Sequence, residues 1–161
     1  MSINHLAVDL AAAARELADR HAITDLIHAY CFHFDNNEPE AVGALFTDDA
    51  PVDYGPESAT IVGSAAIATT IAVGLEQTFA ATSHHVSNIQ ITFEDASRAR
   101  SVTYLYAWHR YVDGSPDGEL WGRYRHRFAR TDAGWRISEL RLEVAGTVDF
   151  HRATMHPIGR R

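Results

Sequence analysis

The strongest evidence for the fold lies in residues 99–148, ARSVTYLYAWHRYVDGSPDGELWGRYRHRFARTDAGWRISELRLEVAGTV. Aromatic and β-branched residues fill most of it, while glycine, aspartate and proline gather in two short segments. This pattern predicts three long strands joined by tight turns, with a fourth strand before them. The strands are expected at 84–94, 99–112, 120–130 and 135–148. Because the links between them are short, we expect an antiparallel meander.

The sequence before the meander is helical. Residues 6–36 contain neither proline nor glycine, and the helix is expected to end at Asn36, Asn37 and Pro39. Apolar residues recur at helical spacing along one stripe: Ile23, Leu26, Ile27, Tyr30 and Phe34. A second face is small and apolar with one carboxylate, and consists of Ala18, Ala22, Asp25, Ala29 and Phe32. A helix that is apolar on two sides is predicted to lie between other elements.

Shorter elements connect the helix to the meander. We expect helices at 40–46 and 64–80, the second capped by Ser64, and short strands at 52–54 and 59–62. Helices followed by a meander predict an α+β fold, a cone-shaped curved antiparallel sheet wrapped around the N-terminal helices. One open mouth of such a cone suits a small apolar ligand. Residues 1–148 form the single expected domain, and 149–161 a tail that could be loose.

Composition excludes several classes of function. The chain has 161 residues, 46% of them hydrophobic, and a formal net charge of −7. All 14 basic residues are arginine, which excludes a lysine Schiff base and a phosphate-binding P-loop. An acidic balance without a basic stripe argues against nucleic acid. The single cysteine, Cys31, excludes an internal disulfide and any zinc site that needs a cysteine pair.

Targeting and metal signals are absent from the sequence pattern. No stretch is long and apolar enough for a membrane span, and no secretory signal opens the chain, so the cytoplasm is the expected location. The ten histidines contain no His-x-x-x-His or His-x-Glu spacing, so we expect no metal and no cofactor.

Few polar side chains fall on elements expected to be buried. They are Asp25, Asp35, Tyr54, His84, His85 and His109. A carboxylate beside an imidazole orients it and stabilises the protonated ring, and a tyrosine hydroxyl stabilises a developing oxyanion. Together these groups suit an elimination or an enolisation. His84 and His85 face opposite sides of a strand, and simple alternation groups His85 with the apolar residues that follow, unless a bulge intervenes.

Three segments carry a resemblance to a known family. They are RHAITDLIHAYCFHFDNNEPEAVGALFTDDAPVDYG at 20–55, TSHHVSNIQITF at 82–93 and RTDAGWRISELRL at 130–142. Over about residues 15–145 the chain resembles SnoaL-like proteins of the nuclear-transport-factor-2-like (NTF2-like) superfamily. The nearest branches are scytalone dehydratase, bile-acid 7α-dehydratase and hexachlorocyclohexane dehydrochlorinase. The resemblance implies a cystatin-like α+β barrel that is commonly trimeric and works without metal or organic cofactor.

The resemblance also implies roles for particular residues. His84 matches the catalytic base, and Asp25 matches the carboxylate that pairs with that base in the dehydrochlorinase. Asp35, Tyr54 and His109 match polar groups of the scytalone dehydratase pocket. Whether Asp25 or Asp35 pairs with His84 stays open. Candidate substrate-binding residues are Tyr30, Phe32, Phe79, Trp108 and Trp121.

The expected function is therefore that of a cofactor-independent lyase (dehydratase or dehydrohalogenase) or isomerase. His84 would abstract a proton from a small apolar cyclic substrate. Two alternatives are a noncatalytic ligand-binding protein and a protein like the small subunit of ring-hydroxylating dioxygenases. Large residues on the outer side of strand 99–112 (Tyr104, Tyr106 and Trp108) predict a homo-oligomer, a trimer first, with neither nucleic acid nor membrane as partner.

Overall fold

A computed structural model describes residues 3–158, which form three helices and six strands. The helices are α1 (Ile3–Asp35), α2 (Pro39–Gly43) and α3 (Ser64–Gln77). The strands are β1 (Pro51–Asp53), β2 (Ile61–Val62), β3 (Phe79–Phe93), β4 (Arg98–Tyr111), β5 (Gly118–Thr131) and β6 (Gly134–Val148). The predicted α+β organisation is confirmed. Ser64 does not cap α3, because Gly63 is the N-cap residue and the Ser64 hydroxyl bonds Asp48 instead.

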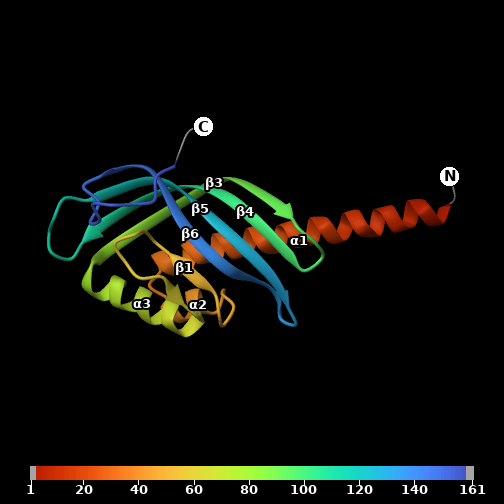
Figure 1. Cartoon of the computed structure of the whole chain (residues 1–161), viewed down its shortest axis with the longest axis horizontal. Coiled ribbons are helices and arrows are strands. Elements are labelled where there is room, and N and C mark those ends of the chain that lie inside the picture. Colours follow the sequence, from red (N-terminus) through yellow and green to blue (C-terminus); the bar gives the residue numbers. More distant parts are fainter. Residues whose placement is uncertain (1–2, 159–161) are drawn as a thin grey trace.

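All six strands belong to one sheet, in the order β2-β1-β6-β5-β4-β3. Strands β3 to β6 form the predicted antiparallel meander. The short strand β1 adds to β6 in parallel, so the sheet is curved but remains open at β2 and β3. The sheet curves over the second half of α1, with α2 and α3 at one end and the first half of α1 projecting away (Figure 1).

One stripe of α1 and the inner face of the sheet make the core. Ile23, Ile27 and Tyr30 are at most 1% exposed, and they share the core with inward side chains such as Phe128 and Leu140. Buried and more exposed residues alternate along β4 and most of β5, and every second side chain points to this core. Burying each large apolar side chain stabilises the fold by roughly 1.5–3 kcal/mol.

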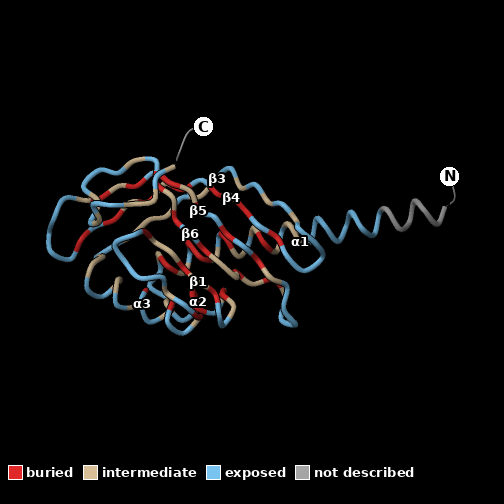
Figure 2. Tube along the Cα trace, in the orientation of Figure 1, coloured by how far each residue is buried: buried red, intermediate tan, exposed pale blue. Residues whose placement is uncertain are grey.

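The prediction that α1 is covered on two sides is wrong. On the second face, the side chain of Asp25 is 62% exposed, and Phe32 as a whole residue is also 62% exposed. The sheet reaches only the Ile23 stripe, and the mostly alanine second face offers little apolar area for another element to cover. From Leu10 to Ala18 the helix is exposed all round (Figure 2).

A bulge in β3 resolves the question of which histidine faces inward. Ser87 pairs with Tyr104, but the next pair is Gln90 with Val102, so β3 holds one extra residue there. Asn88 sits in the bulge with φ of 48°, a left-handed conformation that asparagine tolerates better than most residues. The bulge reverses the alternation, so that His84 lies on the same side as the apolar residues beyond the bulge.

The strand that carries His84 also starts earlier than predicted. β3 begins at Phe79, five residues before the expected start, and Phe79 pairs with Tyr111 of β4. After β6, residues 149–158 return across the sheet and form a segment that we call the strap. The backbone amide of Val144 donates to the carbonyl of His156 at 2.8 Å, so the strap packs on the body. Among residues 3–158, no helix has the length and apolar character needed to cross a bilayer.

Candidate active site

A largely apolar cavity of about 310 Å³ lies between the helices, the inner face of the sheet and the strap. Its lining comes from every layer of the fold: Tyr30, Phe34, Tyr54, Thr70, Ile71, Val73, Gly74, Thr78, Phe79, His84, Leu105, Ala107, His109, Leu120, Tyr124, Leu142, Phe150, His151 and Arg152. An apolar cavity of about 150 Å³ is known to hold benzene, so this one has room for one substituted ring or two fused rings.

The last residue of α1 meets β3 at the cavity. Oδ1 of Asp35 lies 2.6 Å from Nδ1 of His84, and its Oδ2 accepts the backbone amide of His84 at 2.8 Å. The hydroxyl of Thr82 donates to Oδ1 of Asp35 at 2.7 Å. Three contacts therefore fix the carboxylate, and the carboxylate fixes the imidazole ring. Thr82 lies on the same side of β3 as His84 and was not predicted from sequence.

This arrangement favours an ionised Asp35. Burial raises the pKa of Asp35, but the hydrogen bonds and charge of His84 outweigh burial, and the pKa lies below its usual value. An ionised Asp35 accepts a proton held on Nδ1 of His84, which leaves the lone pair on Nε2. The His84 side chain is 5% exposed and packs edge-on against Phe34, with ring centroids 4.9 Å apart. His84 lines the cavity, and an unprotonated Nε2 is a group that can accept a proton.

Two tyrosines supply hydroxyl groups to the same cavity. The hydroxyls of Tyr30 and Tyr54 are 2.7 Å apart, and the ring of Tyr124 packs edge-on against Tyr30. Burial raises the pKa of Tyr54 to about 12, despite its hydrogen bond with Tyr30 and the charge of Arg152. Both hydroxyls stay protonated at neutral pH, so they can donate to an oxygen that gains negative charge during a reaction.

His109 stands beside His84, with ring centroids 5.5 Å apart. Burial and then the neighbouring imidazoles of His84 and His151 lower the pKa of His109 to about 3. His109 is thus neutral at pH 7 and serves as a hydrogen-bonding group rather than a cation. Its Nδ1 is buried and has no side-chain hydrogen-bond partner among residues 10–158.

The strap contributes residues that sequence reasoning did not assign to the site. Phe150, His151 and Arg152 all line the cavity. Burial, then the charge of Arg152, lowers the pKa of His151 to about 4, so this imidazole is also neutral. The strap lacks the periodic pattern of a helix or strand. The only hint in the sequence was that two histidines fall in this segment.

Four of the candidate residues lie away from the cavity. Asp25 points outward from α1 and pairs with His21 at 3.4 Å, and Phe32 is exposed on the same helix. Trp108 and Trp121 alternate with inward residues on β4 and β5, which places their side chains on the outer face of the sheet. The structure brings together Asp35, His84, Tyr54, His109, Tyr30 and Phe79, and it leaves Asp25, Phe32, Trp108 and Trp121 outside.

Other chemistries find little support in the described part of the chain. Within the side chains that the structure describes, those of residues 10–158, no three His, Cys, Asp or Glu residues gather in a way that could hold a metal ion. Cys31 is buried in the core, and burial raises the pKa of its thiol to about 12, so it remains an unreactive thiol.

A strongly curved sheet that encloses an apolar cavity against helices is the architecture of NTF2-like proteins with the cystatin-like fold, and this chain is of that class. Within the class, the chain belongs to the SnoaL-like family, whose domain model matches residues 15–141. The family resemblance predicted from sequence is thereby confirmed. Comparison with curated proteins gives no match.

Several solved structures are similar to this chain. A protein of Novosphingobium aromaticivorans DSM 12444, provisionally named a scytalone dehydratase, is 34% identical over 92% of this chain and 99% of its own, with a TM-score of 0.86. A second protein of that species, provisionally named an aromatic ring hydroxylase, is 26% identical over 81% and 91%, with a TM-score of 0.75. A hexachlorocyclohexane dehydrochlorinase of Novosphingobium barchaimii LL02 is 19% identical over 92% and 99%, with a TM-score of 0.77, and shares the fold.

Proposed function

We propose that this chain is a cofactor-independent lyase, of the dehydratase or dehydrohalogenase type, or an isomerase. Its substrate is a small, mostly apolar, cyclic compound bound in the cavity. The observation that carries the proposal is the 2.6 Å contact between Asp35 and His84 at the wall of an apolar cavity. The similarity to a provisionally named scytalone dehydratase supports the same class of reaction.

The proposed reaction starts with proton abstraction. Nε2 of His84 takes a proton from a carbon next to an electron-withdrawing group, and Asp35 stabilises the imidazolium that forms. The electron pair of the C–H bond forms a double bond as the leaving group departs. A halide leaves as the anion, and a hydroxyl leaves as water after taking the proton that His84 removed. In an isomerisation the proton returns to a different carbon.

Tyr54, Tyr30 and His109 assist without changing charge. A carbonyl or hydroxyl oxygen of the substrate accepts a hydrogen bond from Tyr54, which is itself in contact with Tyr30. The neutral ring of His109 offers a second polar contact beside His84. Apolar lining from Phe34, Phe79 and the strap excludes water, which strengthens each of these contacts.

The test is a substrate panel with matched variants. Cyclic β-hydroxyketones and chlorinated cyclohexanes are incubated with the protein, and conjugated product and chloride release are measured. His84→Ala is expected to lower the rate by about 10²-fold or more and to keep the melting temperature. His85→Ala is the control, because its exposed side chain lies on the other face of the strand. Normal turnover by a folded His84→Ala protein would overturn the imidazole-base mechanism in favour of a noncatalytic ligand-binding protein.

We further propose that the chain associates with itself through the outer face of the sheet, a trimer being the first expectation. Tyr104 and Trp121 are each 42% exposed, and the Trp121 ring lies 5.8 Å from that of Tyr106. Exposed aromatic residues that lie together on a sheet face favour an interaction surface. Light scattering at micromolar concentration is expected to give a multiple of the chain mass, and Trp121→Glu to reduce it. A wild-type mass equal to one chain would contradict self-association.

A further inference from the structure

The cavity contains one fixed charge that the proposed reaction does not use. Arg152 of the strap lines the cavity, and no aspartate or glutamate does within the described residues. Asp35 lies behind His84 rather than in the lining. Among the side chains of residues 10–158, no carboxylate forms an ion pair with the Arg152 guanidinium. Glu57 lies at the strap, where it accepts the backbone amide of Thr154 at 2.6 Å, but it does not line the cavity. A half-buried arginine beside a lining without carboxylates can bind an anionic ligand.

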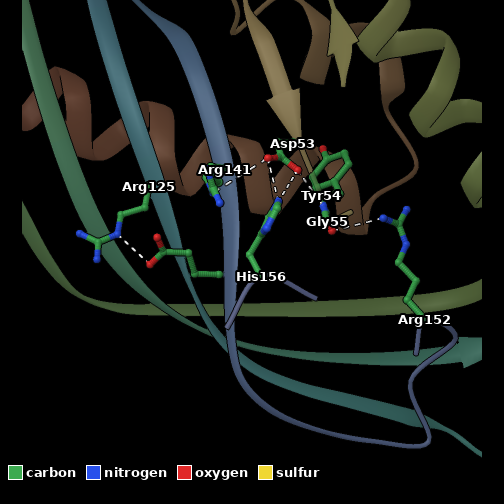
Figure 3. Close-up of polar contacts among 8 residues, drawn as sticks. Asp53, Tyr54, Gly55, Arg125, Arg141, Arg152 and His156 are labelled. Atoms are coloured by element: carbon green, nitrogen blue, oxygen red, sulfur yellow. Dashed lines mark hydrogen bonds and ion pairs between the residues drawn. The ribbon is translucent and has the colours of Figure 1, made fainter. Parts of the chain in front are cut away.

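The guanidinium is already held in place by the body of the protein. Nη1 donates to the carbonyl of Tyr54 at 3.2 Å and to the hydroxyl of Ser58 at 2.8 Å, and Nε donates to Nε2 of His151 at 3.2 Å. These bonds use three of the roughly five N–H groups of an arginine side chain and leave those of Nη2. Figure 3 shows Arg152 reaching from the strap to Tyr54, while His156 of the strap contacts Asp53 of β1.

A pre-oriented guanidinium with unused N–H groups on Nη2 can donate a hydrogen bond to an anionic oxygen. The side chain gives up little conformational freedom on binding, because its three existing contacts already fix it. Its charge-assisted hydrogen bonds are stronger than neutral ones. The protein as a whole carries a net charge of −7, so a bound anion needs such a local cation to offset the repulsion.

The distance between Arg152 and His84 limits which ligands can contact both residues. The ring centroids of His84 and His109 are 5.5 Å apart, and those of His109 and His151 are 6.4 Å apart. Arg152 in turn contacts His151. The base and the guanidinium are thus separated by two imidazole rings. A molecule that reaches both carries its acidic C–H and its anionic group on different parts of a ring system.

We propose that Arg152 is a substrate-binding residue that selects cyclic compounds bearing a carboxylate, with the carboxylate on Nη2 of Arg152 and the reacting carbon near His84. Only the placement of the reacting carbon near His84 rests on the proposed function. The anion-binding end can be measured without turnover, so the two can fail separately.

The test compares two probes of nearly the same shape, 2-naphthoate and 2-naphthamide, by calorimetric titration of the full chain. The wild-type protein is expected to bind 2-naphthoate about tenfold or more tightly than 2-naphthamide. Arg152→Gln is expected to remove this preference by weakening only the naphthoate, and Arg152→Lys to keep part of it. Arg136→Gln, an arginine of β6 outside the lining, is the charge control and is expected to keep the preference.

Two further variants separate the explanations. Ser58→Ala removes one of the three contacts that hold the guanidinium without changing charge, so the naphthoate preference is expected to weaken only in part. His84→Ala is expected to keep the preference while turnover is lost, which distinguishes failure of the anion site from failure of the base mechanism. Equal binding of both probes by the wild-type protein would overturn the assignment. So would equal weakening of both probes by Arg152→Gln, which would make Arg152 an anchor of the strap only.

Discussion

At the scale of single residues, Asp25 and Asp35 show that position along one helix decides the role of a carboxylate. Both belong to α1 and both were candidates to orient His84. Asp35 ends the helix where β3 passes, and it accepts bonds from His84 and Thr82. Asp25 lies almost three turns earlier, on the face that the sheet does not cover, and its side chain is 62% exposed. Only Asp35 is placed to stabilise a protonated His84.

Asp35→Asn is expected to slow the proposed reaction at least tenfold, because an amide cannot stabilise the imidazolium and can hold the ring in the wrong tautomer. Asp25→Asn is the matched control and should leave the rate unchanged. The measurement is the rate across pH 5–9 on a substrate from the panel, together with thermal melts of both variants. A slow Asp25→Asn variant beside a normal Asp35→Asn variant would reverse the assignment.

The same carboxylate adds a pH dependence to stability. The pKa of Asp35 is lowered in the folded chain, so its contribution to stability is present above the pKa of the unfolded chain. That contribution is lost as pH falls through the lowered value. Asp35→Asn lacks this ionisation and should lose less stability on acidification than the wild-type protein.

At the scale of elements, the bulge in β3 decides which side chains enter the cavity. One extra residue between Ser87 and Gln90 reverses the alternation of the strand. Thr82 and His84 therefore share a face with Ile89 and Ile91, which pack against the core. Regular pairing would turn either the histidine or the apolar residues away from the helix, since a one-residue slip exchanges the two faces of a strand.

The conformation of Asn88 predicts the stability of variants in the bulge. Asn88→Val is expected to lower the free energy of unfolding by about 1–2 kcal/mol, because a β-branched residue is strained at a φ of 48°. Asn88→Gly should change the free energy of unfolding by less, since the relief of backbone strain offsets the larger conformational entropy that glycine loses on folding. Ser87→Val is the control at a regular, exposed position of the same strand. Urea denaturation measures all three, and a neutral Asn88→Val would contradict the strained bulge.

At the scale of the whole molecule, the fold holds several imidazoles neutral. Burial lowers the pKa of His126 to about 3, and burial with nearby charges lowers those of His109 and His151 to about 3 and 4. Nε2 of His126 has no partner among residues 3–158, and its Nδ1 lies 3.3 Å from the hydroxyl of Ser101. In the unfolded chain these rings have the ordinary histidine pKa of 6.5. Below that pH the unfolded chain therefore binds protons that the folded chain does not.

Stability is therefore expected to fall as pH drops below about 6.5, since the unfolded state then binds protons that the native state does not. Each such ring contributes up to about 1.4 kcal/mol per pH unit to the slope. His126→Phe should make the decline shallower, whereas His28→Gln, on an exposed part of α1, should not. Urea denaturation at pH 4.5 to 7.5 measures this, and identical slopes for the wild-type and His126→Phe proteins would contradict it.

Local periodicity and turn residues were enough to predict the α+β class, the four long strands and the buried stripe of α1. The sequence also supplied His84, Tyr54 and His109 as candidates, through the family resemblance and the small number of polar residues on buried elements. The tertiary structure decided which of them meet. The choice of Asp35 over Asp25 depends on where β3 crosses the helix, and the inward orientation of His84 depends on one extra residue. Arg152 joins the cavity only because the strap folds back over it. Crossing points, register and the path of an irregular segment are set by contacts between residues far apart in the chain, which no local pattern records.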